Sequence, residues 1–394
     1  MKTRYYLDYN ATTPTDPRVV EAMKPYFFDN FHNPSSFYRR AGEANHAVEN
    51  AREQLAQLIH AESKEIFFTS GGTESDNLAI QGTVFLLRDK GNHIITSQIE
   101  HPAVLKTCKY LEQNGFEVTY LPVDRYGFVD PADLKKNIKD TTILVTIMHA
   151  NNETGTLQPL KELAEIAHQK GVIFHTDAVQ STGKIPVDVK ELDVDLLSFS
   201  SHKIYGPKGM GALYKKHKVK IAPIIFGGGH EKGVRAGTEN VQGIVGMGKA
   251  AELARLEMAG EEKKLRPLRD RLQKEFVEKI PEVLVNGDTD KRLYNTLNVS
   301  IKYIEGEAML AMLDQQGFAL SSGSACSSKS LDPSHVLLAI GLKHEDAHGS
   351  LRISLGKFNT PEDVDKLIEA LPPVVERLRS MSPFWSTRRD KSEK

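Results

Sequence analysis

Cysteine is scarce in this sequence: Cys108 and Cys326 are the only two among 394 residues. Two cysteines cannot form a disulfide framework, and they suit a reducing compartment. An excess of either charge is also missing, because 51 basic and 52 acidic residues leave a net charge of -1. This balance argues against binding to nucleic acid or to an anionic membrane surface. No hydrophobic run reaches the roughly 20 residues that span a bilayer.

The start of the chain offers little room for a targeting segment. We expect a strand at residues 4–7, and therefore no signal or transit peptide before it. Together with the scarce cysteines, this predicts a cytoplasmic protein that binds neither nucleic acid nor a membrane.

Apolar and charged residues occur in ordinary globular proportions, 40% and 26%. Short, nearly continuous apolar runs alternate with helical patterns, which is typical of an α/β fold with a mainly parallel, doubly wound sheet. The expected strands are 66–69, 94–97, 118–123, 143–148, 172–175 and 194–199. Two helices are expected at 242–259 and 260–279, with a domain boundary near residue 260 between them. We predict a large α/β domain at 13–260, a small α+β domain from 1–12 and 261–383, and a disordered tail at 384–394.

Polar side chains follow several of these strands, where open α/β sheets bind their ligands. Asp177 ends one buried strand, and Lys203 follows the next. Alone, Lys203 would be interpreted as a solvated loop residue. A lysine that forms a Schiff base and an acid that pairs with a pyridinium nitrogen are, however, the protein's part of pyridoxal phosphate chemistry.

Gly72 and Thr73 begin a helix, and free N–H groups at a helix start favour a phosphate. The alternative is simple helix capping, because Thr73 and Asp76 resemble a capping box. Three further residues complete the expected cofactor site: Ser200 and His202 beside the lysine, and His101 as an aromatic cap over the cofactor ring.

Ten segments occur in the order expected of one family: YLDYNATTP, NPSS, TSGGTESDN, EHPAV, NNETG, HTDAVQ, SSHKIYGPKG, GGGHEKGVRAGTEN, SSGSACSS and LRISLG. From residue 6 to about 383 the chain resembles the cysteine desulfurases of the NifS/IscS branch. These are fold-type I pyridoxal-phosphate enzymes of the class-V aminotransferase family. The resemblance implies a large domain with a mainly parallel seven-stranded sheet flanked by helices, plus a small α+β domain. One departure is Tyr38, where the family often has histidine, and we assign that residue no role.

The resemblance implies a role for each matching residue. Lys203 would hold the cofactor as a Schiff base and move protons, and Asp177 would pair with the pyridinium nitrogen. Gln180 would hydrogen-bond the phenolic oxygen, and His101 would stack on the ring and act as an acid or base. The residues expected to hold the phosphate are Gly72, Thr73, Ser200 and His202.

Three further residues are expected to complete the active site. Asn152 and Arg352 would fix the substrate, because a guanidinium can bind both oxygens of a carboxylate. Thr238 would reach the phosphate in the partner subunit, which implies a homodimer with shared active sites.

Cys326 separates this family from aminotransferases. By itself it could be an incidental loop cysteine, but within SSGSACSS we expect it to take sulfur from L-cysteine as a persulfide, leaving L-alanine. The sulfur would pass to an iron–sulfur scaffold protein or another acceptor. Whether Cys326 also ligates a cluster during transfer stays open, and no other metal ligand is predicted. The alternatives are a selenocysteine lyase or aminotransferase, and a non-enzymatic sulfur-transfer scaffold.

Overall fold

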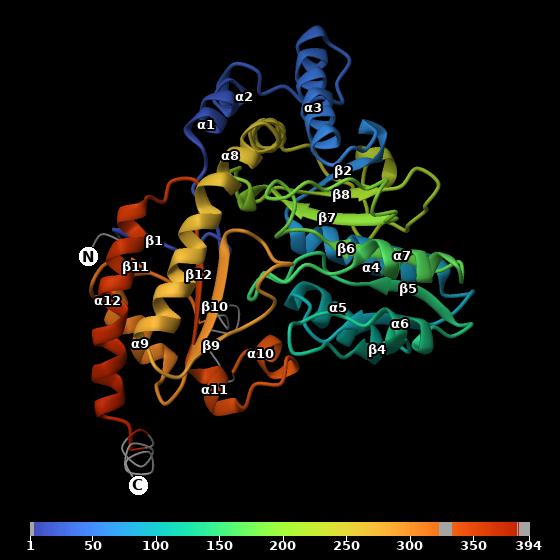
Figure 1. Cartoon of the computed structure of the whole chain (residues 1–394). Coiled ribbons are helices and arrows are strands. Elements are labelled where there is room, and N and C mark those ends of the chain that lie inside the picture. Colours follow the sequence, from blue (N-terminus) through green and yellow to red (C-terminus); the bar gives the residue numbers. More distant parts are fainter. Residues whose placement is uncertain (1–3, 323–332, 384, 386–394) are drawn as a thin grey trace.

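A computed structural model describes residues 4–322, 333–383 and 385. Its largest sheet has seven strands in the order β2-β8-β7-β6-β5-β3-β4 (Figure 1). All neighbours pair in parallel except β8, which is antiparallel to both β2 and β7. The predicted mainly parallel, seven-stranded α/β sheet is therefore confirmed. Its strands are β2 (Ile66–Thr69), β3 (His93–Ser97), β4 (Glu117–Leu121), β5 (Thr142–Thr146), β6 (Ile173–Asp177), β7 (Leu196–Ser200) and β8 (Gly211–Lys215).

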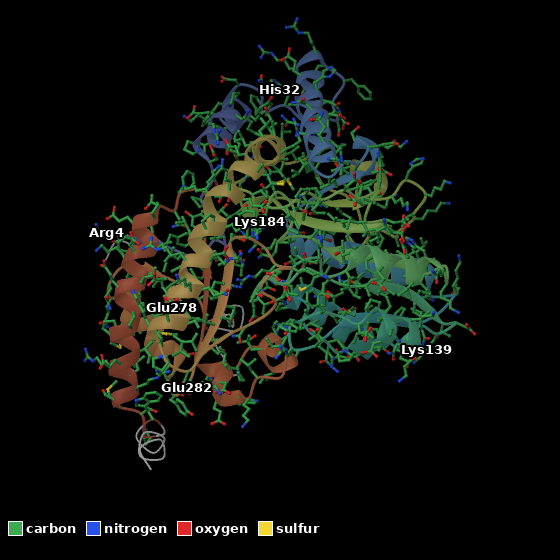
Figure 2. All side chains as sticks on the ribbon, viewed as in Figure 1. Arg4, His32, Lys139, Lys184, Glu278 and Glu282 are labelled. Atoms are coloured by element: carbon green, nitrogen blue, oxygen red, sulfur yellow. The ribbon has the colours of Figure 1, made fainter. Side chains whose placement is uncertain are left out.

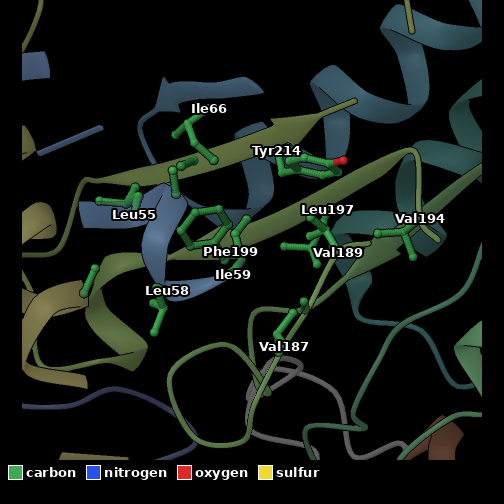
Figure 3. Close-up of a cluster of buried hydrophobic side chains, with 14 of the residues drawn as sticks. Leu55, Leu58, Ile59, Ile66, Val187, Val189, Val194, Leu197, Phe199 and Tyr214 are labelled. Carbon is green, nitrogen blue, oxygen red and sulfur yellow. The ribbon is translucent and has the colours of Figure 1, made fainter. Parts of the chain in front are cut away.

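Helices cover both faces of this sheet because successive strand residues point to opposite sides. Ile94 and Leu144 pack in the same cluster as residues of α4 and α5, whereas their neighbours Ile95 and Val145 pack with residues of α3, α6 and α7. Figure 3 shows the second of these cores, where Leu55 of α3 lies near Phe199 of β7. The flanking helices are α3 (Arg39–Leu58), α4 (Gly72–Leu87), α5 (Pro102–Gln113), α6 (Pro131–Asn137) and α7 (Leu160–His168).

A smaller antiparallel sheet, β12-β10-β9, lies in the C-terminal third beside the pair β1-β11. Its buried residues form a separate core with those of the surrounding helices. The strands are β1 (Tyr5–Tyr6), β9 (Val283–Val285), β10 (Thr296–Ile301), β11 (Phe318–Ala319) and β12 (Ser350–Ser354). The helices are α9 (Gly306–Asp314), α10 (His335–Ala339), α11 (His344–His348) and α12 (Pro361–Ser380).

One long helix, α8 (Val241–Lys279), replaces the two helices expected on either side of residue 260. Its first part packs in the core of the large sheet and its last part in the core of the small sheet (Figure 1). Gly260 lies inside the helix, since flanking good helix formers offset its cost of about 1 kcal/mol. The remaining elements are α1 (Pro17–Met23), α2 (Pro25–Phe28) and the 3₁₀ helices η1 (Ser63–Glu65), η2 (Ser201–Lys203) and η3 (His230–Gly233).

The two cores suit a division into residues 13–260 and 1–12 with 261–383, which stays a proposal because α8 crosses the boundary. Of the tail expected to be disordered, residues 384 and 386–394 lie outside the described part of the chain. Among the described helices, none combines the length and the apolar character needed to cross a bilayer.

Candidate active site

A cavity of about 330 Å³ lies where β5, β6 and β7 end and α4 begins. Its volume is in the range of small-molecule sites, and its position is the strand-end crevice of open α/β sheets. Ten of the twelve predicted site residues line it: Gly72, Thr73, His101, Asn152, Asp177, Gln180, Ser200, His202, Lys203 and Arg352. Thr238 does not; it is exposed in the loop before α8. The twelfth, Cys326, lies outside the described residues.

The Lys203 side chain is held by backbone carbonyl groups. Lys203 ends η2, directly after β7, and its Nζ donates to the carbonyl oxygens of Asn10 and, at 2.8 Å, Ala11. Both belong to the polar loop after β1. These contacts fix the amine at the cavity wall, as a Schiff-base lysine requires.

Asp177 is a buried carboxylate at the end of β6, and its Oδ1 accepts a hydrogen bond from the N–H of Val179 at 2.9 Å. Burial raises its pKa, and the neighbouring His101 opposes that rise. Asp76 is also buried, and burial and the charge of Asp177 hold the pKa of Asp76 well above its ordinary value. Because only Asp177 receives a backbone N–H, we assign the negative charge of this pair to Asp177. A cation in the cavity, such as a pyridinium, would stabilise that charge.

His101 is the N-cap of α5, and its Nδ1 accepts the N–H of Ala103 at 3.1 Å. Burial lowers the pKa of His101, which favours the neutral ring. With Nδ1 accepting, the proton of the neutral ring resides on Nε2. His101 therefore offers both a flat ring and a titratable nitrogen to the cavity that it lines.

The start of α4 leaves room for an anion. Its N-cap is Gly71, without a capping side chain, and Glu74 accepts from Ser70, so the alternative capping box of Thr73 and Asp76 is wrong. A Cβ on Gly72 would lie 2.7 Å from Cγ2 of Val179, so this approach requires glycine. The helix start therefore keeps its N–H groups for a ligand.

His202 lines the same cavity as the start of α4. Its Nδ1 lies 3.0 Å from Oγ1 of Thr12, and burial lowers the pKa of His202 to about 4. The ring is therefore neutral near pH 7. A hydroxyl-bonded neutral imidazole and an uncapped helix N-terminus are a suitable donor set for a phosphate ester.

Arg352 lies on β12 and reaches the cavity from the small sheet. Its Nη2 pairs with Oδ1 of Asp8 at 2.7 Å, and its Nη1 donates to the carbonyl oxygen of Asn152 at 3.1 Å. The buried Nε of Arg352 has no hydrogen-bond partner among the described residues. The contacts with Asp8 and Asn152 use two of the five guanidinium N–H groups, so donors remain for a carboxylate while the position of Arg352 is fixed.

Comparison with known proteins agrees with this geometry. The aminotransferase class-V family model matches residues 5–367. The "Cysteine desulfurase IscS" of Methanosarcina thermophila is 56% identical over 96% of this chain and 94% of its own. A solved structure described as a NifS-like protein superposes with a TM-score of 0.90 at 40% identity, over 95% of this chain and 100% of its own. Another, "SspA in complex with cysteine", has a TM-score of 0.80 at 38% identity, over 91% and 100%.

The chain belongs to the cysteine desulfurases of the class-V aminotransferase family. The predicted resemblance and fold type are therefore confirmed. In this desulfurase the last described residues before Cys326, Ser321 and Ser322, are joined to β12, which also carries Arg352. Ser321 and Arg352 pair backbone to backbone, and Oγ of Ser350 donates to the carbonyl oxygen of Ser322 at 2.8 Å. On the other side of the undescribed residues, Oγ of Ser334 bonds the buried Glu153.

Sequence reasoning missed two residues that line the cavity, Asn10 and Asp76, and two that contact its lining residues, Asp8 and Lys184. Asn10 lies in the YLDYNATTP segment and received no role there, although its carbonyl oxygen accepts from both Lys203 and Gln180. Asp76 was considered only as a capping residue. The signal for Lys184 was its place four residues after Gln180, within one short turn-rich segment.

Proposed function

We propose that this protein is a pyridoxal-phosphate-dependent cysteine desulfurase that converts L-cysteine to L-alanine and leaves the sulfur on Cys326. The observation that carries the proposal is the single cavity shared by Lys203, Asp177 and His101 at an uncapped helix start. Membership of the cysteine desulfurases supports the same reaction.

Pyridoxal phosphate fits the residues present. Lys203 would join it as a Schiff base, and the start of α4, Ser200 and His202 would hold its phosphate. Asp177 would face the pyridinium and Gln180 the phenolic oxygen. When bound, the cofactor supplies an electron sink for bonds at the amino acid's Cα.

The chain's own residues position the substrate and move its protons. Arg352 would bind the carboxylate, with Asn152 beside it, because a guanidinium binds carboxylates in a fixed plane. Lys203 would take and return the proton at Cα from the cavity wall. The protonated Nε2 of His101 would serve as a second acid or base. Arg352 is buried, whereas Asn152, Lys203 and His101 are partly exposed where they line the cavity.

Cys326 would take the sulfur directly from the substrate. Its thiolate attacks the substrate sulfur, an S–S bond forms and the Cβ–S bond breaks, and a proton then replaces sulfur at Cβ. Atoms and electrons balance as L-cysteine plus thiol giving L-alanine plus persulfide. Ser322, four residues before Cys326 in the sequence, is hydrogen-bonded by Ser350 of β12, the strand that carries Arg352.

We also propose a homodimer in which Thr238 contributes to the partner's phosphate site. Arg235, three residues before Thr238, pairs with Glu74 at the start of α4, which ties this exposed loop to the cavity's own helix. Phe28, Phe31 and other aromatic side chains near α2 and α3 are exposed, as expected of a surface that a second copy covers. A cytoplasmic location and delivery of sulfur to an iron–sulfur scaffold complete the proposal.

The test is a single turnover with L-cysteine that measures alanine and persulfide in wild type, Cys326→Ala and Cys108→Ala. Cys108 is fully buried in α5, so its variant controls for loss of a thiol away from the cavity. We expect wild type and Cys108→Ala to form both products, and Cys326→Ala to keep its bound cofactor but form neither. Alanine at the wild-type rate from Cys326→Ala would show that the sulfur leaves by another route.

A further inference from the structure

Lys184 is a second lysine at this site and is more deeply buried than Lys203. Only 6% of it is exposed, and it is labelled inside the fold in Figure 2. Its Nζ donates to Oε1 of Gln180 at 2.8 Å and to Oδ1 of Asn10 at 3.2 Å. Lysine is almost never buried without a specific partner. The side-chain oxygens of Gln180 and Asn10 therefore allow Lys184 to be buried here.

Burial, together with the charges of Lys203 and Arg352, lowers the pKa of Lys184 to about 7, while Glu261 opposes this shift. Both protonation states carry N–H donors for the two oxygens, so the contacts persist on either side of pH 7.

The contact with Gln180 decides which way its side-chain amide points. One end of an amide accepts and the other donates, and a lysine ammonium can only donate. Oε1 must therefore face Lys184, which turns Nε2 the opposite way. Nε2 donates to the carbonyl oxygen of Asn10 at 3.0 Å, the same oxygen that accepts from Lys203. The donor end of Gln180 thus lies on the Lys203 side.

We propose that Lys184 is a positioning residue that fixes the amide of Gln180 so that its donor, Nε2, serves the cofactor cavity. The inference rests on the proposed function, because the acceptor it would serve belongs to pyridoxal phosphate. That cofactor carries an ionisable phenolic oxygen on the ring carbon adjacent to the one that bears the aldehyde, and the aldehyde is the group that lysine joins. A fixed donor favours the ionised oxygen, and a flipped amide would disfavour it.

The experiment follows the visible absorbance of the cofactor-loaded protein as pH is varied. Wild type is compared with Lys184→Met, Gln180→Leu and the double variant. We expect Lys184→Met to raise the pH midpoint of the absorbance change by about one unit or more, because it removes the fixed donor. We expect the same shift for Gln180→Leu. In the Gln180→Leu background, Lys184→Met should add no further shift. Lys184→Gln, a neutral donor, should stay near the wild-type midpoint.

The double variant separates positioning from charge. If the shift persists at full size when Gln180 is leucine, Lys184 acts through its charge and the proposal is wrong. An unchanged midpoint in folded, loaded Lys184→Met also overturns it. If Lys184→Met does not fold, Lys184→Gln provides the test. Its side-chain amide can still donate, so a one-unit shift of its pH midpoint would contradict the hydrogen-bond argument. A wild-type protein that takes up no pyridoxal phosphate would overturn the proposed function, and this inference with it.

Discussion

Replacing Glu100 with glutamine should make the protein's stability less dependent on pH. Glu100 is fully buried between β3 and His101, and its Oε1 accepts from Oγ of Ser97 at 2.6 Å and the N–H of Met148 at 2.9 Å. Its Oε2 has no partner among the described residues. Burial raises the pKa of this carboxyl to about 8 from its ordinary 4.5, despite the two hydrogen bonds.

The sign and size of the effect follow from proton linkage. Between pH 4.5 and 8 the unfolded chain releases the Glu100 proton while the folded chain retains it, so stability falls as pH rises and the loss is complete above about pH 8. Each pH unit is worth about 1.4 kcal/mol. Relative to Glu100→Gln, wild type should therefore lose about 4 kcal/mol of unfolding free energy between pH 5 and pH 8.

The assay is urea unfolding of the apoprotein, followed by circular dichroism at several pH values. Glu278→Gln, at an exposed position of α8, controls for the loss of one carboxylate (Figure 2). Other titrating groups are common to all three proteins and cancel in the difference. A difference between wild type and Glu100→Gln that changes by less than about 1 kcal/mol over this range would refute the reasoning, because Glu100 would then be ionised in the folded protein at pH 5.

Two further substitutions test the proposed carboxylate site and a buried ion pair outside the cavity. Arg352→Lys should raise KM for L-cysteine about tenfold or more and change kcat little, since a lysine cannot bind both carboxylate oxygens in one plane; a lower kcat at unchanged KM would contradict this role. Arg52→Met should cost about 3–5 kcal/mol in urea unfolding, because Glu231, bonded by Arg52 at 2.8 and 2.9 Å, is left buried without its cation. Adding Glu231→Leu should recover most of that loss, and no recovery would mean that the cost is packing.

The sequence pattern could place the site because its key residues follow buried strands. Asp177 and Lys203 end neighbouring strands, and parallel strands bring their carboxyl ends to one edge whatever the details of packing. The same reasoning failed for β8, which was not predicted. This strand is as long as its neighbours, but it follows a glycine-rich turn and runs antiparallel between β2 and β7, so its pairing partners rather than its own pattern define it.

Lys184 and Asn10 were beyond sequence reasoning for a different reason. Their contact joins positions 174 residues apart, and no local periodicity encodes it. Asn10 also donates through Nδ2 to Oγ1 of Thr296, on β10. Asn10 therefore joins the loop after β1 to Lys184 and the small sheet through its side chain, and to Lys203 through its backbone carbonyl. Only the assembled fold shows this.

This arrangement explains why the small sheet is needed beside a cavity formed mainly by the large one. Arg352 comes from β12, and its backbone pairs with Ser321, where the segment carrying Cys326 begins. The group proposed to bind the substrate carboxylate and the start of the sulfur-accepting segment are thus held by one strand. A shift of β12 would move both together relative to Lys203. The geometry therefore places the proposed carboxylate site and the start of the proposed sulfur-accepting segment on one strand, and Asn10 contacts both the small sheet and Lys203, the residue proposed to transfer protons.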